Sequence, residues 1–174
     1  MIVGWEGKEP RLDPTVRMAE NASAVGDVTA EAGVSLWYGA VVRGDVSPIR
    51  IGRDTNIQDN AVIHGDHGVP TELGAQVSVG HSAVLHSCRV EDGCVIGMGA
   101  VVLKGCVIGA ESMVAAGAVV AGGAIIPPGS LVVGVPGRVK RTLTPEERHK
   151  LRDNAAEYLR LAAQLPQVEK RSQA

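Results

Sequence analysis

The sequence predicts an all-β solenoid: a left-handed parallel β-helix of hexapeptide repeats with a C-terminal α-helix packed along it. An aliphatic residue returns every six positions through most of the chain. The 174 residues include 22 glycines and no phenylalanine, yet 45% of them are apolar, mostly Val, Ala and Ile. This apolar content is enough to offset the entropy of ordering the chain, so glycine-rich disorder is excluded.

The six-residue period is strictest in the second half of the chain. Neither the 3.6-residue period of an α-helix nor the alternation of a simple strand produces it, whereas short strands joined by tight turns do. Three hexads then form one triangular coil of about 18 residues, with the aliphatic side chain inside and a small residue near the corner. Glycine supplies turn conformations with positive φ, and phenylalanine does not fit so narrow an interior. The repeating aliphatic residues are Val90, Ile96, Val102, Ile108, Val114, Val120, Ile126 and Val132.

The same register continues upstream with interruptions. These are a longer step at 47–50, an excursion at 64–72 and a five-residue step before Val90. The hexapeptide form of the parallel β-helix is left-handed, an exception to the right-handed crossover rule. The upstream residues expected to point inward are Ala30, Leu36, Val42, Ile51, Ile57, Ile63, Leu73, Val79 and Leu85.

A helix is expected after the repeats end at 134–138. Thr144 and Pro145 are residue types typical of an N-cap and a first helical position, and two glutamates follow them in the first turn. An apolar stripe predicts a helix from about Pro145 to Leu165, ended by Pro166 and packed along one face of the prism. The stripe consists of Leu151, Ala155, Tyr158, Leu159 and Ala162.

These elements divide the chain into a β-helix domain at 1–140, a C-terminal helix at 141–166 and a flexible tail at 167–174. The net charge of −2 provides no basic surface for nucleic acid. No signal peptide and no uninterrupted apolar run of membrane-spanning length are present, so no membrane contact and a cytoplasmic location are expected. The three cysteines form no C-x-x-C pair, and packing is the expected role of Cys88, Cys94 and Cys106.

The positions of the histidines follow from the hexads. His64 and His86 each follow an inward aliphatic residue, and they are three hexads apart, so they stack on one face about 4.8 Å apart along the axis. Arg43 heads the same column one coil earlier. His81 belongs to another face, which it shares with Gln58.

One subunit therefore cannot bring its third histidine to the other two. A homotrimer could, because one face of each prism would meet another face of its neighbour and complete a three-histidine site at each interface. Three imidazoles plus one solvent molecule form the open tetrahedral arrangement of catalytic zinc, and this arrangement also accepts cobalt or iron(II). His67, in the excursion, and His149, on the helix, are expected to be exposed.

These motifs resemble those of the gamma-class carbonic anhydrases, a family of homotrimeric left-handed β-helix enzymes. The resemblance covers about residues 10–160. It rests on RGD at 43–45, NIQDNAVIH at 56–64 and VGHSAVLHSC at 79–88. The GVPGR sequence at the end of the repeats is less specific, because hexapeptide acyltransferases share it.

The resemblance implies a reaction and a role for each matching residue. The reaction is the reversible hydration of CO2 to bicarbonate by metal-bound hydroxide, with Zn2+, or Fe2+ or Co2+, as the metal. Arg43 and Asp45 form an inter-subunit ion pair, with Arg43 also near the substrate. Gln58 hydrogen-bonds the metal-bound solvent, Asp59 is an acid beside it, and Tyr158 covers the pocket from the C-terminal helix. The implied metal ligands are His64, His81 and His86.

The sequence also departs from the founding pattern of the family. The archetype has a glutamate directly after RGD that serves as proton shuttle, whereas Val46 follows here. The short excursion offers only Asp66, His67 and Glu72, or none of them, as a shuttle, so hydration is expected to be slow. Two alternatives stay open: an acyltransferase with one histidine as general base and acyl-coenzyme A between coils, and a non-catalytic metal-binding trimeric scaffold.

Overall fold

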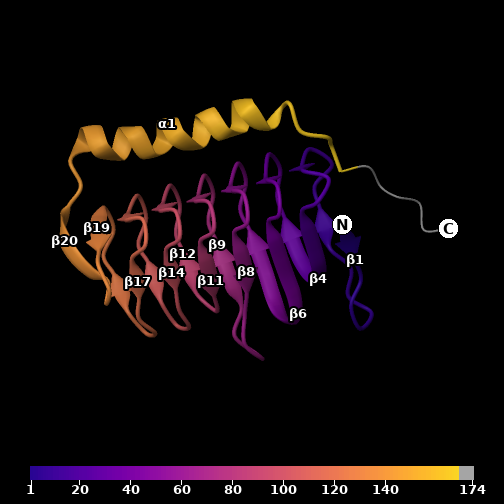
Figure 1. The fold of residues 1–174 in the computed structure, drawn as a ribbon, viewed down its shortest axis with the longest axis horizontal. Coiled ribbons are helices and arrows are strands. Elements are labelled where there is room, and N and C mark those ends of the chain that lie inside the picture. Colours follow the sequence, from indigo (N-terminus) through magenta and orange to yellow (C-terminus); the bar gives the residue numbers. More distant parts are fainter. Residues whose placement is uncertain (169–174) are drawn as a thin grey trace.

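The computed structural model describes residues 1–168 and forms a parallel β-solenoid with one C-terminal helix, as predicted. Figure 1 shows helix α1 running along one edge of the stacked coils, from the C-terminal coils back toward the N-terminal ones. Strands that are about one coil apart in sequence lie next to each other and pair in parallel. The prism has three faces, called here the first, second and third face.

The first face carries the two strands that contain the stacked histidines. Two strands are long enough to turn a corner, so that their first halves lie on the first face and their second halves on the second. The first face consists of β1 (Ile2–Val3), the first halves of β4 (Ser23–Ala30) and β6 (Val41–Ile51), β8 (Val62–His64), β11 (Val84–His86), β14 (Val101–Val102) and β17 (Val119–Val120).

The second and third faces complete each coil. The second face consists of β2 (Arg11–Leu12), the second halves of β4 and β6, β9 (Thr71–Leu73), β12 (Arg89–Val90), β15 (Val107–Ile108) and β18 (Ile125–Ile126). The third face consists of β3 (Arg17–Met18), β5 (Ser35–Leu36), β7 (Asn56–Ile57), β10 (Ser78–Val79), β13 (Val95–Ile96), β16 (Met113–Val114) and β19 (Ser130–Val133). It ends with β20 (Arg138–Thr142), which pairs antiparallel to β19.

The core confirms the hexad register. Every aliphatic residue expected to point inward is at most 6% exposed, from Ala30 through Val132. Turn glycines such as Gly99 and Gly117 have φ values of 65° and 68°, as predicted for the corners. A prism filled by β-branched residues thus closes without aromatic bulk.

The longer step at 47–50 is accommodated inside β6. The register between β4 and β6 shifts after the Gly26–Gly44 pair and resumes at Val28 and Ile49. Pro48 lies in this bulge, where its missing N–H breaks no ladder hydrogen bond. Gly26 (φ 71°) is required here, because a Cβ at this position would lie 2.6 Å from the carbonyl oxygen of Gly44.

Helix α1 spans Pro145–Ala162 and begins with the predicted N-cap. The Thr144 side chain accepts the N–H of Glu147, whose carboxylate accepts the N–H of Thr144, which completes a capping box. Leu151 and Ala162 are buried, but Leu159, predicted to join the packed stripe, is 42% exposed. Leu159 therefore lies at the margin of the stripe, where its Cδ1 still comes close to Gly33 of the prism.

The helix also ends earlier than predicted, at Ala162 rather than near Leu165. Gln167 forms a bridge with Arg17, and the N–H of Val168 donates to the carbonyl of Val16. The first two residues of the expected flexible tail at 167–174 therefore pair with the N-terminal coil. The rest of that expectation lies outside the described residues. Within residues 1–168, no helix is long and apolar enough to cross a membrane.

Candidate metal centre

His64 and His86 stack on the first face, as the hexad count predicted. They occupy the same position of β8 and β11, which pair in register. Their ring centroids lie 5.2 Å apart at an interplanar angle of 63°. Nδ1 of His64 lies 3.3 Å from Nε2 of His86, so one ring nitrogen of each histidine faces the other.

This distance tests whether the pair fits a metal ion. Two nitrogens bound tetrahedrally to zinc, each at about 2.0–2.1 Å, lie about 3.3–3.4 Å from each other. The separation of His64 Nδ1 and His86 Nε2 matches that edge of the tetrahedron. The two imidazoles therefore fit a shared divalent cation.

The RGD segment orients His64 from the coil above. Oδ1 of Asp45 lies 2.9 Å from Nε2 of His64, the nitrogen that faces away from His86. A carboxylate on that nitrogen fixes the tautomer that leaves the Nδ1 lone pair free. Burial alone raises the pKa of Asp45, but the hydrogen bond with His64 and the charge of Arg43 outweigh it and hold the pKa below its usual value.

Arg43 pairs with Asp45 of its own chain. The two residues are two apart on β6, so their side chains project from the same side of the strand. The inter-subunit ion pair that the family resemblance implied stays a prediction, and within one chain the two side chains pair with each other. Gly44 between them allows close strand packing, since a Cβ there would lie 2.5 Å from the carbonyl oxygen of Asp27.

His81 lies at the end of the third face, after β10, and has its own carboxylate. Nδ1 of His81 lies 2.8 Å from Oδ2 of Asp59, and the Tyr38 N–H donates to Oδ1 of Asp59 at 3.1 Å. The hydroxyl of Tyr158, from α1, lies 3.4 Å from Nε2 of His81. Burial, with the Asp59 carboxylate adding to it, raises the pKa of Tyr158 above its usual value, so the hydroxyl stays protonated.

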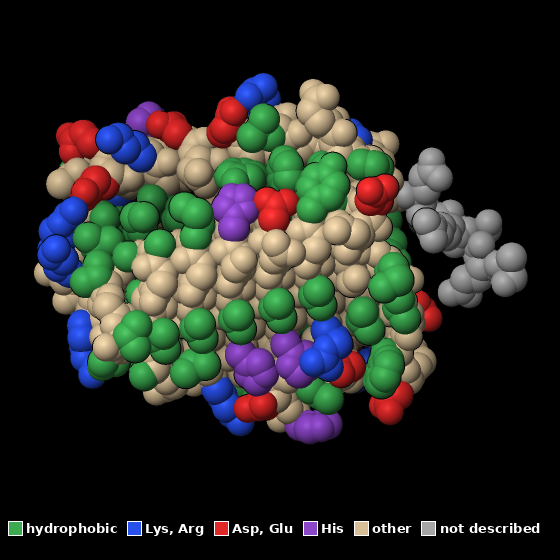
Figure 2. All heavy atoms as spheres, viewed as in Figure 1, with side chains coloured by type: hydrophobic (Ala, Val, Ile, Leu, Met, Phe, Trp, Pro, Cys, Tyr) green, Lys and Arg blue, Asp and Glu red, His purple; other side chains and the backbone are tan. Residues whose placement is uncertain are grey.

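No single chain assembles the three histidines. Among residues 1–168, no group of three or more His, Cys, Asp and Glu side chains lies close enough to hold a metal ion. Figure 2 accordingly shows histidine side chains in separate places on one face of the molecule. Each half of the arrangement, the stacked pair and the single histidine, has its own orienting aspartate.

Gln58 lies on the third face with His81, as predicted. It is 6% exposed, and its Nε2 donates to Oδ1 of Asn56 at 3.0 Å. Nδ2 of Asn56 in turn donates to Oγ of Ser78 at 2.9 Å. This amide ladder was not predicted; its only sequence signal is the alternation of polar residues with inward aliphatics in β7 and β10.

Asp66 is the shuttle candidate nearest the stacked pair. Its Oδ1 lies 4.0 Å from Nε2 of His86, and its Oδ2 lies 3.0 Å from Nζ of Lys104. The hydrogen bond from Lys104 is the main cause that lowers the pKa of Asp66. Lys104 was not predicted, because it reaches the site from the turn of a later coil. His67 is exposed in the loop, as expected.

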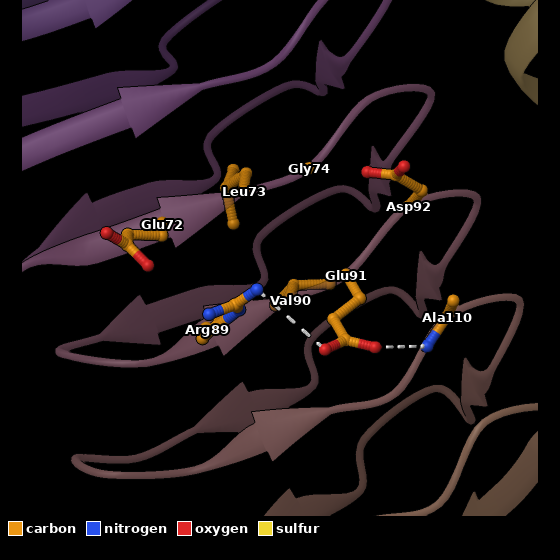
Figure 3. Close-up of a pocket in the computed structure, with 8 residues that line it drawn as sticks. All are labelled: Glu72, Leu73, Gly74, Arg89, Val90, Glu91, Asp92 and Ala110. Atoms are coloured by element: carbon orange, nitrogen blue, oxygen red, sulfur yellow. Dashed lines mark hydrogen bonds and ion pairs between the residues drawn. The ribbon is translucent and has the colours of Figure 1, made fainter.

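Glu72 lies away from the histidines. It sits in β9 on the second face, in register between Arg50 and Arg89. Figure 3 shows Glu72 and Arg89 on neighbouring strands beside a groove of about 320 Å³. The cross-strand neighbours of Glu72 are thus two cations rather than a histidine.

The remaining candidates behave as packing or surface residues. Cys88, Cys94 and Cys106 are free and buried, as predicted. Burial raises the pKa of both Cys88 and Cys94 to about 12, so their thiols stay protonated near neutral pH. His149 is exposed beside Asp153, with Nε2 and Oδ1 3.6 Å apart.

The chain is similar in sequence to several known proteins. The family described as "Bacterial transferase hexapeptide (six repeats)" matches residues 87–122. The chain is 54% identical over 154 residues to "Probable carbonic anhydrase" of Methanocaldococcus jannaschii, covering 88% of this chain and 97% of the relative. It is 52% identical over 161 residues to "Gamma carbonic anhydrase 3, mitochondrial" of Arabidopsis thaliana, covering 89% of this chain and 62% of that longer protein.

A solved structure shares the whole fold. The crystal structure of a hexapeptide transferase family protein from Anaplasma phagocytophilum matches with a TM-score of 0.91 and 39% identity, covering 94% of this chain and 96% of that one. The histidine placement and the archaeal relative, matched over nearly its full length, lead to one conclusion. The chain belongs to the gamma-class carbonic anhydrase family.

Proposed function

We propose that this protein is a metal-dependent carbonic anhydrase that works as a homotrimer and hydrates CO2 reversibly to bicarbonate. The observation that carries the proposal is the 3.3 Å separation of His64 Nδ1 and His86 Nε2. Two imidazole nitrogens facing each other at a tetrahedral edge length suit a divalent cation better than a single general base. A cytoplasmic location remains a prediction of the sequence.

Three histidines from two subunits would hold the metal. His64 and His86 come from the first face of one subunit, and His81 comes from the third face of its neighbour. When bound, Zn2+, or Fe2+ or Co2+, supplies a Lewis acid that lowers the pKa of water to about 7 and so makes hydroxide available at neutral pH. Because the three ligands are neutral, the full charge of the cation acts on the site.

The chain's own residues then orient the histidine ligands and the solvent and stabilise the developing negative charge. Asp45 and Asp59 fix the tautomers of His64 and His81, which leaves His64 Nδ1 and His81 Nε2 unprotonated. The Arg43 guanidinium, 44% exposed beside Asp45, favours the negative charge that develops as bicarbonate forms. Gln58 supplies an amide whose N–H donates to Asn56, which leaves its oxygen to accept a hydrogen bond from solvent in the site.

Proton removal is the expected bottleneck. Val46 stands where the family archetype has a glutamate, and Asp66 is tied to Lys104 with a lowered pKa. A carboxylate that stays ionised accepts protons poorly near neutral pH. The enzyme is therefore expected to be slow unless the buffer carries the proton.

Stopped-flow CO2 hydration with metal-free, zinc-loaded and iron(II)-loaded trimer tests the proposal. Metal analysis of anaerobically purified protein identifies the resident ion. We expect hydration above the buffer rate in at least one metal state, rising with buffer concentration. Full metal occupancy without turnover would instead favour the scaffold alternative.

An acyltransferase is the second candidate, because the hexapeptide family and the Anaplasma structure are described as transferases. The stacked pair argues against it, since one general base needs neither a second histidine 3.3 Å away nor a third with its own aspartate. Isothermal titration with acetyl-coenzyme A separates the two: binding that persists in metal-free protein would favour the transferase.

A further inference from the structure

The dipeptide Trp37–Tyr38, in the turn after β5, reaches both ring nitrogens of His81 by two routes. The Tyr38 N–H holds Asp59 at 3.1 Å, and Asp59 Oδ2 lies 2.8 Å from His81 Nδ1. The Trp37 indole meets the Tyr158 ring edge to face, with centroids 5.4 Å apart and planes at 89°. The Tyr158 hydroxyl lies 3.4 Å from His81 Nε2.

The two routes act on different nitrogens of His81, Asp59 on Nδ1 and Tyr158 on Nε2. An ionised carboxylate only accepts hydrogen bonds, so Asp59 requires a proton on Nδ1 of His81. The Nε2 lone pair is then free, and the Tyr158 hydroxyl is placed to donate to it. This lone pair is also the one that His81 would offer to a metal ion.

Trp37 is itself fixed in place. Its Nε1 donates to Oγ of Ser35 at 3.1 Å, and Ser35 is 1% exposed. The indole also packs against the hydrophobic core. An anchored ring in edge contact restricts the rotamers of Tyr158 and keeps its hydroxyl over His81.

We propose that Trp37 is a positioning residue for the metal site: it holds the Tyr158 hydroxyl on the Nε2 lone pair of His81, where hydroxyl and metal ion compete. The inference rests on the proposed function, because it takes His81 as a metal ligand. Loading the site then requires Tyr158 to release His81. The metal in each interface is thereby coupled to the C-terminal helix of the subunit that contributes His81.

Cobalt titration of the metal-free trimer, followed by visible absorption, tests this coupling. Y158F removes the competing donor and keeps the ring, so it should bind Co2+ about two- to fivefold more tightly than the wild type. W37L frees the Tyr158 ring and should shift affinity in the same direction by a smaller factor. In the Y158F background W37L should cause no further change, because the hydroxyl on which Trp37 acts is gone. W5L, at the exposed second tryptophan, is the matched control and should leave affinity unchanged.

Unchanged affinity in both Y158F and W37L, or effects that simply add, would overturn the proposal. If W37L does not assemble, W37F replaces it, since it keeps a ring but loses the donor to Ser35; the same direction of change is expected.

As a second readout, Zn2+ added to W5F should change the fluorescence emission of Trp37. An unchanged emission at full zinc occupancy would contradict the release of His81 by Tyr158. A wild type that takes up no cobalt would overturn the proposed function as well, whereas a wild type that binds cobalt like its variants overturns only this inference.

Discussion

Nε2 of His64 lies 2.9 Å from Oδ1 of Asp45. The two residues are nineteen positions apart in sequence, but their strands, β8 and β6, are adjacent on the first face. This contact assigns the two nitrogens of His64: Nε2 carries the proton shared with Asp45, and Nδ1 faces His86. The orientation of the stacked pair therefore depends on a residue that does not touch the metal itself.

Replacing Asp45 should loosen the metal site. D45N keeps the size of the side chain but no longer enforces the His64 tautomer, so zinc affinity should fall about 10- to 100-fold. Competition with a chromophoric chelator measures it. D54N, at a turn outside the site, is the control and should bind zinc like the wild type; equal affinities for D45N and D54N would show that Asp45 does not orient His64.

The absence of phenylalanine should reflect the narrow prism. Val120 is 0% exposed inside β17, whereas its neighbour Val119 points outward. V120F should destabilise the protein by about 1–3 kcal/mol or more through overpacking, and V119F should be much milder. Thermal unfolding compares the two, and similar melting temperatures would mean that the interior has room for an aromatic ring.

The buried thiols should be unreactive in the folded protein. Cys94 is 0% exposed, and burial raises its pKa to about 12, so neither access nor thiolate is available near neutral pH. Cys88 has a pKa raised to about 12 for the same reason. A thiol reagent such as DTNB should label neither cysteine until denaturant unfolds the chain. Rapid labelling of native protein at either position would contradict the packing.

Acid should weaken the start of helix α1. The hydrogen bond from Arg141 is the main cause that lowers the pKa of Glu147 from 4.5 to about 2. A lowered folded pKa means that Glu147 stabilises the fold fully above about pH 4.5 and loses that contribution as pH falls toward 2. The melting-temperature difference between wild type and E147Q should therefore shrink between pH 6 and pH 3. E20Q, which changes an exposed carboxyl away from the helix, is the control. A melting-temperature difference between wild type and E147Q that stays constant between pH 6 and pH 3 would contradict this assignment.

The sequence could predict the coils and the histidine column because both follow from local spacing. A six-residue lattice fixes which side chains point inward, so Ile63 and Leu85 also fix the positions of His64 and His86. The N-cap at Thr144 is equally local. These predictions needed no knowledge of contacts between distant segments.

Other features depend on tertiary contacts that spacing does not encode. Lys104 meets Asp66 because a loop of irregular length folds down onto a later coil. Trp37 meets Tyr158 because α1 packs beside the third face of the prism, near β7. The exposure of Leu159 has the same origin, since the apolar stripe of a helix does not reveal how much of the helix surface the prism buries.

The central claim is that each metal site is shared between subunits, and mixing two inactive variants tests it most directly. H81A and H64A should each assemble as trimers without metal or CO2 hydration, because every interface lacks one ligand. After denaturation and refolding together in equal amounts, each mixed trimer should contain one intact interface, restoring metal and activity at about a quarter of all sites. No recovery in mixed trimers, or full metal occupancy in H81A alone, would contradict the account.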